Sequence, residues 1–158
     1  MKKNILLLLI MTLLTFPVFA DEKKEALDFF NNYVESANNY SPTIAEMYSP
    51  DAKIIRQIVK PDGTTANATT DTATYIKQMK LGQAGAKLRK YKNNYTNINV
   101  IPQNDGSYKV TSLRQPSGED YKLKMYMIVT KQPNGKWLIT EEMMQTKVQT
   151  LLRYADKE

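Results

Sequence analysis

Cysteine and histidine are both absent from the 158 residues of this chain. Without cysteine the chain has no disulfide, so an exported form must be stabilised by its hydrophobic core alone. Without histidine it lacks the commonest general base, the commonest metal ligand and every triad that contains histidine. Only carboxylates remain as metal ligands, and no Asp-rich calcium loop or glycine-rich phosphate loop occurs. We therefore expect no metal and no cofactor, and we assign no catalytic residue.

Long hydrophobic runs are also scarce, and the single one lies at the N-terminus. Lys2 and Lys3 precede the apolar run 5–14, and the segment ends with the small residue Ala20 before the charged Asp21. This pattern is typical of a secretory signal peptide, and the run is too short for a membrane span. We predict a signal peptide over 1–20 and a single domain over 21–158. The mature chain is then soluble, not inserted in a membrane, and periplasmic in a bacterium.

Charge of either sign forms no cluster along the chain. The formal net charge is +6, from 22 basic and 16 acidic residues, and the lysines are scattered. Scattered lysine indicates solubility more than a nucleic-acid track. We therefore expect no nucleic-acid partner.

The clearest structural signal is the stretch Tyr121–Met144. Apolar residues alternate with other residues in its first arm, at the period of a β-strand. Asn134-Gly135 then favours a tight turn, and the second arm begins with Trp137. We interpret the stretch as the central hairpin of an antiparallel sheet. The residues expected on its inner face are Tyr121, Leu123, Met125, Met127, Val129, Trp137, Ile139 and Met143.

Helices are predicted mainly in the first half of the chain. Apolar residues at three- and four-residue steps predict a helix over Asp21–Asn39. Ser41-Pro42 favours the start of a second, short helix. Asp71 or Thr72 can cap a third helix that ends near Gly82. We expect a flexible connection over 83–90 and a short C-terminal helix over 146–154.

Strands are predicted over Ala52–Val59, Tyr91–Ile101 and Ser107–Arg114, in addition to the central hairpin. The segment Thr64–Thr70 is small and polar and is interpreted as an exposed loop. Helices in the first half and an antiparallel meander in the second indicate an α+β fold. Its three N-terminal helices would pack on a curved sheet that leaves a cone-shaped pocket at one mouth.

Two short motifs fit this order of elements. Tyr33-Val34 on the first helix and the run 47–52, Met-Tyr-Ser-Pro-Asp-Ala, resemble the nuclear transport factor 2-like superfamily, which includes SnoaL-type cyclases and ketosteroid isomerases. The resemblance implies that Tyr33 matches the oxyanion-hole tyrosine of the isomerases. It places Arg56 where their general base stands, and it finds no acid in the run 125–128 where their protonated aspartate stands. The chain therefore resembles a non-catalytic member of the superfamily.

Four kinds of side chain are candidates for ligand contact. Tyr33 could donate a hydrogen bond to a ligand, or it could be a core tyrosine. Arg56 and Arg114 could bind an anionic ligand through their forked guanidinium groups, or pair with Glu141 or Glu142. Glu141 and Glu142 are adjacent in a predicted strand, so their side chains point to opposite faces. Glu141 is an even number of residues from Trp137 and Ile139, so we predict that Glu141 is the carboxylate that points inward. Apolar residues complete the predicted ligand site: Tyr75, Met125, Met127 and Trp137. The strand residues among them could instead form the ordinary interface between the sheet and the helices.

Three functions remain open at this point. The first is a binding domain that holds a small apolar or amphipathic ligand, or docks a protein partner on its sheet. The second is an isomerase or lyase that uses Tyr33 with Glu141 or Asp51. The third is an accessory or inhibitory subunit of a cell-envelope assembly. The outer sheet face, expected to carry Tyr126, Ile128, Leu138 and Met144, also suggests a homodimer.

Overall fold

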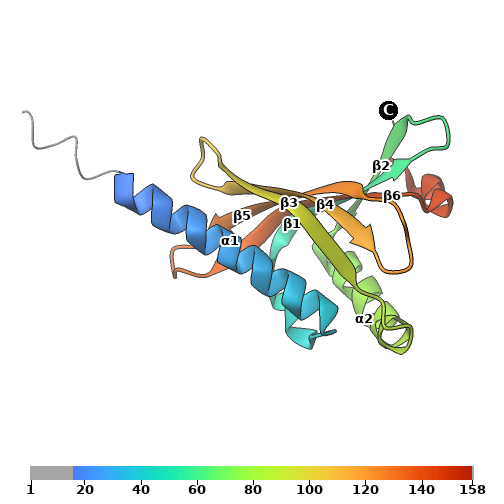
Figure 1. Cartoon of the computed structure of the whole chain (residues 1–158), viewed down its shortest axis with the longest axis horizontal. Helices are drawn as coiled ribbons and strands as arrows, with labels where there is room; N and C mark the ends of the chain where they lie inside the picture. Colours follow the sequence, from blue (N-terminus) through green and yellow to red (C-terminus); the bar gives the residue numbers. More distant parts are fainter. Residues whose placement is uncertain (1–15, 158) are drawn as a thin grey trace, which may run out of the picture.

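The computed structural model describes residues 16–157, so the first fifteen residues of the expected signal peptide lie outside it. Helices lie against one side of a long, twisted sheet (Figure 1). The elements in chain order are α1 (Phe16–Asn38), η1 (Pro42–Met47), β1 (Tyr48–Val59), β2 (Thr65–Asp71), α2 (Thr72–Leu88), β3 (Asn93–Pro102), β4 (Tyr108–Pro116), β5 (Leu123–Lys131), β6 (Trp137–Thr146) and η2 (Gln149–Tyr154). The predicted α+β class is confirmed.

The described strands form one six-stranded sheet in the order β2-β1-β6-β5-β4-β3. The run β3 to β6 is the predicted meander of antiparallel neighbours. The expectation of a wholly antiparallel sheet was wrong at one place, because β1 pairs with β6 in parallel. The elements between β1 and β6 bring the chain back beside its first strand. The first and last strands of the chain, β1 and β6, are therefore neighbours within the sheet.

The first strand pair also corrects a loop assignment. The segment predicted as an exposed loop over 64–70 is largely β2, which pairs antiparallel with β1 from Val59↔Thr65 to Lys53↔Asp71. Its threonines are polar but β-branched, and β-branched residues fit an edge strand well. The turn between the strands needs a positive φ, which Gly63 supplies at 83°.

η1 and α2 begin at the residues predicted from capping chemistry. α1 begins earlier than predicted, and α2 ends later than predicted. Ser41 accepts from the N–H of Thr43 at the start of η1, which is a 3₁₀ helix, and Asp71 accepts from Thr74 at the start of α2. The prediction of a helix end near Gly82 and a flexible 83–90 segment was wrong, because α2 continues to Leu88. Glycine inside a helix costs about 1 kcal/mol relative to alanine, which weakens a helix without ending it. The first helix, α1, begins at Phe16, five residues before the expected start.

A bulge in β6 decides which of its side chains face the helices. Val129 pairs with Ile139 and Ile128 pairs with Glu141, so Thr140 is an extra residue in the ladder. Such an insertion shifts the alternation of faces by one residue. Glu142 is therefore fully buried and Glu141 lies on the outer face, the reverse of the predicted assignment. The same shift turns Met144 inward and Met143 outward.

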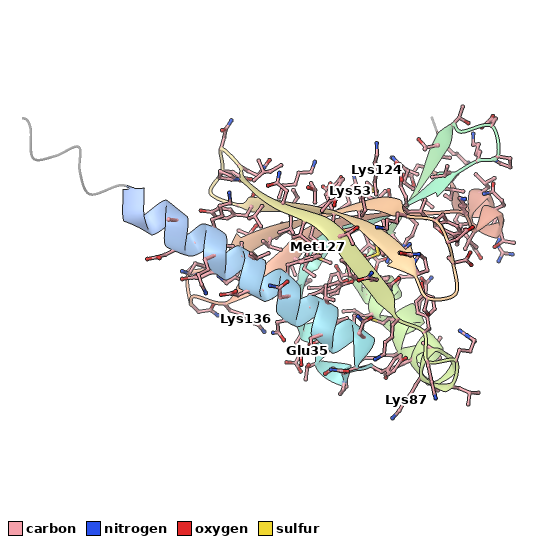
Figure 2. All side chains as sticks on the ribbon, viewed as in Figure 1. Glu35, Lys53, Lys87, Lys124, Met127 and Lys136 are labelled. Atoms are coloured by element: carbon pink, nitrogen blue, oxygen red, sulfur yellow. The ribbon has the colours of Figure 1, made fainter. Side chains whose placement is uncertain are left out.

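The core lies between α1 and the concave face of the sheet. Phe30, Met127 and Ile139 are fully buried in it. Figure 2 shows Met127 inside the molecule, whereas Lys87 and Lys136 project from its surface. The predicted inner residues of β5 are confirmed, because the burial of this strand alternates from Leu123 onward. No helix within residues 16–157 has both the length and the hydropathy of a membrane span.

Candidate functional site

A cavity of about 540 Å³ opens between α1, α2 and the sheet. Its size falls in the range of small-molecule sites, which is roughly 300–1,000 Å³. The C-terminal part of α1 and one face of α2 form two walls, and β1, β3, β4 and β6 form the floor. Apolar and aromatic groups line much of it: Tyr33, Ala37, Ile44, Tyr75, Met79, Ala86, Tyr95, Met144 and Leu151.

Beneath the floor, three donors converge on the buried carboxylate of Glu142. The hydroxyl of Tyr48 donates to Oε2 over 2.5 Å, and that of Tyr33 donates to the same oxygen over 3.2 Å. Nη1 of Arg56 lies 2.8 Å from Oε1 and forms an ion pair with it. Glu142 has no exposed surface, so the charge of Arg56 and the two hydroxyl dipoles replace water around it.

Aromatic rings pack around this network. Tyr48 meets Tyr33 and Tyr75 edge to face, and the guanidinium of Arg56 lies 4.9 Å from the centre of the Tyr75 ring. Burial, followed by the negative charge of Glu142, raises the pKa of Tyr33 and of Tyr48 well above the ordinary value. Both hydroxyls therefore stay protonated and act as donors at physiological pH.

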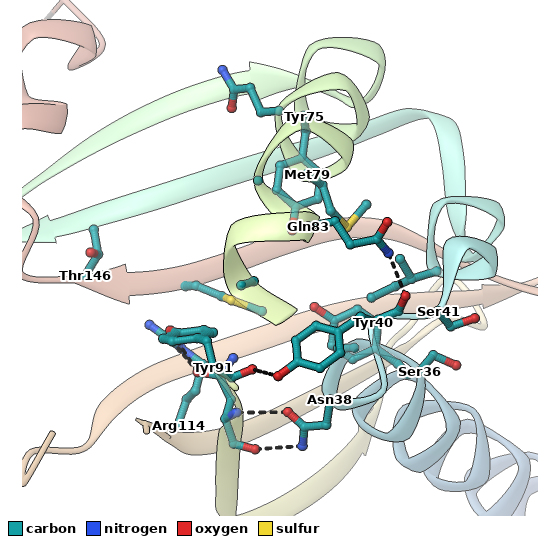
Figure 3. Close-up of a pocket in the computed structure, with 18 of the residues that line it drawn as sticks. Ser36, Asn38, Tyr40, Ser41, Tyr75, Met79, Gln83, Tyr91, Arg114 and Thr146 are labelled. Carbon is teal, nitrogen blue, oxygen red and sulfur yellow. Dashed lines mark hydrogen bonds between the residues drawn. The ribbon is translucent and has the colours of Figure 1, made fainter. Parts of the chain in front are cut away.

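The rim of the cavity is held by hydrogen bonds between segments far apart in the sequence (Figure 3). The side-chain amide of Asn38 exchanges two bonds with the backbone of Asn93, at 3.0 and 2.9 Å. Tyr40 donates its hydroxyl to the carbonyl of Tyr91 over 2.9 Å, and its own carbonyl accepts from Gln83 over 2.7 Å. These bonds tie α1 to β3 and to α2, so the mouth has a defined shape.

Arg114 reaches the cavity from the inner face of β4 and is 8% exposed. Its Nη1 donates to Asn93 Oδ1 over 2.8 Å and to the Tyr91 hydroxyl over 3.4 Å, and its Nη2 donates to the carbonyl of Gln145 over 2.9 Å. Its Nε is buried and has no hydrogen-bond partner within the described residues 16–157. None of the three ion pairs found within residues 16–157 includes Arg114.

The residues predicted to contact a ligand fall in three places. Tyr33, Arg56 and Tyr75 line the cavity together. Met125 and Met127 lie in the core between α1 and the sheet. Trp137 borders a second, smaller hollow of about 310 Å³ and donates to Glu25 over 3.0 Å.

The prediction that Glu141 points inward was wrong, because the bulge at Thr140 turns it to the outer face. There it accepts a hydrogen bond from Tyr126 over 2.5 Å. Sequence reasoning named Glu142 only as one possible ion-pair partner of Arg56, and it missed Tyr48 as a donor to Glu142. The available signal was the resemblance itself, which singled out the run from Met47 to Ala52 without giving Tyr48 a function.

The chemistry available in the cavity is that of donors and apolar surface. Its lining residues include three arginines and no aspartate or glutamate. Glu142 is covered by the side chains that it binds. Within residues 16–157 no three carboxylates lie close enough to form a metal site, and the predicted absence of a metal or cofactor stays a prediction.

Comparison with known proteins shows the fold and nothing finer. No protein-family model matches the chain, and no curated protein matches it significantly. Among solved structures, a putative scytalone dehydratase from Novosphingobium aromaticivorans has a TM-score of 0.58 at 16% identity, over 79% of this chain and 83% of that one. A protein of unknown function from Pectobacterium atrosepticum has a TM-score of 0.60 at 14% identity, over 80% and 91%.

A chain of the complex between the yeast deubiquitinase Ubp3 and its cofactor Bre5 is also similar, with a TM-score of 0.56 at 19% identity over 77% of this chain and 93% of that one. These similar structures include a putative dehydratase and a chain of a protein–protein complex. The fold matches nuclear transport factor 2-like structures, as the sequence resemblance predicted, but this fold serves several kinds of function.

Proposed function

We propose that this chain is a binding domain, exported as its N-terminal sequence predicts, that holds a small amphipathic ligand in the cavity between α1, α2 and the sheet. The observation that carries the proposal is the lining of the cavity. Apolar and aromatic groups make up much of the wall, a few polar donors face the same space, and no carboxylate does. That mixture is typical of a site that binds and orients a small molecule.

The buried network under the floor supports binding because it fixes the walls. Glu142 holds Tyr33 from α1, Tyr48 from the start of β1 and Arg56 from the middle of β1. A wall whose side chains are already ordered loses less conformational entropy when a ligand arrives. The hydrogen bonds at the rim have the same effect on the mouth.

A second candidate function is a lyase or isomerase, and one contact favours it. Tyr33 lines the cavity, and its hydroxyl donates to Glu142. General acid–base chemistry would require a substrate group within hydrogen-bond reach of this pair. Binding remains the better supported function, because Arg56 and Tyr48 already occupy the carboxylate oxygens.

Native mass spectrometry of the protein purified from its own host tests the proposal. We expect the intact protein to carry an additional mass that is lost on denaturation. Ala86 lines the cavity from α2, so Ala86→Trp should fill the space and abolish the bound mass. Ala84 is exposed on the same helix, and Ala84→Trp is the matched control that should retain it.

Two results would contradict the proposal. One is a bare polypeptide mass for the wild-type protein. The other is a bound mass that survives equally in both tryptophan variants, which would place the ligand outside this cavity. Turnover of a small molecule that is lost in Tyr33→Phe, with binding retained, would instead support the enzyme.

A further inference from the structure

We infer that the ligand of this cavity is an amphipathic carboxylate whose anionic head binds the guanidinium of Arg114. This inference rests on the proposed binding function and names the chemical class of the ligand. It depends on a difference between two arginines of the floor, the half-buried Arg56 and the buried Arg114. Arg56 has a carboxylate partner in Glu142, and Arg114 has none within the described chain.

The acceptors around Arg114 are all neutral. An amide oxygen, a phenol and a backbone carbonyl orient the guanidinium but do not balance its charge. Arginine stays protonated in proteins, and an unbalanced buried charge costs several kcal/mol in general. A fixed, buried and uncompensated cation that lines a cavity is therefore suited to an anion brought by the ligand.

The unpartnered Nε adds a geometric reason for a carboxylate. Buried polar atoms without a partner are rare in folded proteins, so each one calls for an explanation. Nε and Nη2 form one edge of the guanidinium, and a carboxylate can accept from both N–H groups of that edge at once. Because Nε has no accessible surface in this structure, a ligand carboxylate would have to displace the groups that cover this edge in order to supply the missing acceptor and the missing charge together.

Neighbouring groups indicate what the rest of the ligand is. Tyr95, the register partner of Arg114 on β3, lines the same space, and its hydroxyl makes no hydrogen bond to residues 16–157. The rings of Tyr33 and Tyr75 and the methionines Met79 and Met144 provide apolar surface beyond the head-group position. Aromatic rings and thioethers pack well against a flat apolar body.

A matched pair of probes separates charge from shape. We would titrate the wild-type protein with 1-naphthaleneacetate and with the isosteric, neutral 1-naphthaleneacetamide by isothermal calorimetry. Charge-assisted hydrogen bonds are about twice as strong as neutral ones. We therefore expect the acid to bind about tenfold more tightly than the amide. In Arg114→Gln the preference should fall to about onefold, with affinity for the amide unchanged.

Arg153 provides the control, because it is exposed, lies outside the cavity lining and carries the same charge. Arg153→Gln should keep the full preference, which excludes an effect of net charge. If Arg114→Gln fails to fold, Arg114→Lys serves instead, since lysine keeps the charge and loses the forked edge, and the preference should fall partway.

Each outcome decides a different statement. Equal affinity of the wild-type protein for acid and amide would overturn the carboxylate inference and leave the binding function intact. A preference for the acid that survives in Arg114→Gln would overturn the assignment to Arg114. Failure of both probes to bind, together with a bare mass from the host, would overturn the binding function itself.

Discussion

Tyr48 and Glu142 are 94 residues apart in the sequence, and the phenol of one lies 2.5 Å from the carboxylate of the other. Tyr48 begins β1 and Glu142 lies in the middle of β6, the two strands that pair in parallel. Their contact therefore depends on the long crossover that returns the chain to its first strand. The floor of the cavity is built on this contact.

Removing the carboxylate at 142 should destabilise the protein strongly. Glu142→Gln leaves the half-buried Arg56 without its counter-ion, and breaking a fully buried pair costs roughly 3–5 kcal/mol. We expect about 3 kcal/mol, because glutamine keeps the shape and one acceptor. Glu141→Gln is the control, since Glu141 lies on the outer face, and it should cost less than about 1 kcal/mol. Urea denaturation of both variants measures the difference, and equal losses would contradict the assignment of faces.

Removing both charges should cost less than the sum of the single changes. Arg56→Met leaves Glu142 unpaired and Glu142→Leu leaves Arg56 unpaired, whereas the double variant leaves neither charge behind. A coupling energy of about 2 kcal/mol is expected from a double-mutant cycle in urea. Strict additivity would show that the ion pair contributes nothing.

The hydroxyl of Ser112 should be dispensable. Ser112 is buried on the inner face of β4, and its Oγ has no partner. An unsatisfied buried hydroxyl carries a desolvation penalty of roughly 1–3 kcal/mol, so Ser112→Ala should leave stability unchanged or raise it. Ser107 is the matched control, because its buried hydroxyl donates to Asp105 over 2.6 Å. Thermal melts should show a loss for Ser107→Ala and none for Ser112→Ala, and a clear loss for Ser112→Ala would mean that this hydroxyl has a partner.

Stability should fall in alkaline solution. The pKa of Tyr33 and of Tyr48 is raised in the folded protein by burial and by Glu142, whereas an unfolded tyrosine titrates near pH 10. Below pH about 10 both states keep the proton. Above it the unfolded chain loses the proton first, so the free energy of unfolding decreases as pH rises.

Urea denaturation from pH 8 to pH 11.5 checks this slope. Tyr33→Phe should flatten it, and replacement of the exposed Tyr154 should not. A slope that is the same in wild type and Tyr33→Phe would exclude Tyr33 as a source of the pH dependence.

Periodicity and turn chemistry predicted the elements that obey a regular pattern. The inner residues of β5, the hairpin turn at Gly135 and the caps at Ser41 and Asp71 follow from local chemistry alone. β2 was missed because its threonines carry two opposite signals, polarity and β-branching. The end of α2 was missed because Gly82 weakens a helix without ending it.

The centre of the site could not be predicted because it depends on one extra residue in a ladder. A bulge at Thr140 reverses the faces of every later residue in β6, and no glycine marks it in the sequence. The choice between Glu141 and Glu142 follows from this residue alone. Arg56 and Arg114 were both recognised as anion ligands or ion-pair partners, but only the structure shows that one is paired and the other is not.

The outer face of the sheet and the export signal remain predictions. Tyr126, Ile128 and Leu138 are half-buried by their neighbours on that face, and Met144, once assigned to it, lies inside. Homodimer formation through this face would be detected by analytical ultracentrifugation. Cleavage after Ala20 would be detected by the N-terminal sequence of the protein from its host.

The measurement that tests the binding account most directly is methyl NMR of the methionine side chains during titration with 1-naphthaleneacetate. Met79 and Met144 line the cavity, whereas Met143 lies on the opposite face of the same strand as Met144. We predict large shifts for Met79 and Met144 that saturate together, with Met143 unchanged. If the probe binds saturably but the shifts are confined to Met143, or no methionine shifts, the central claim that this cavity is the binding site is contradicted.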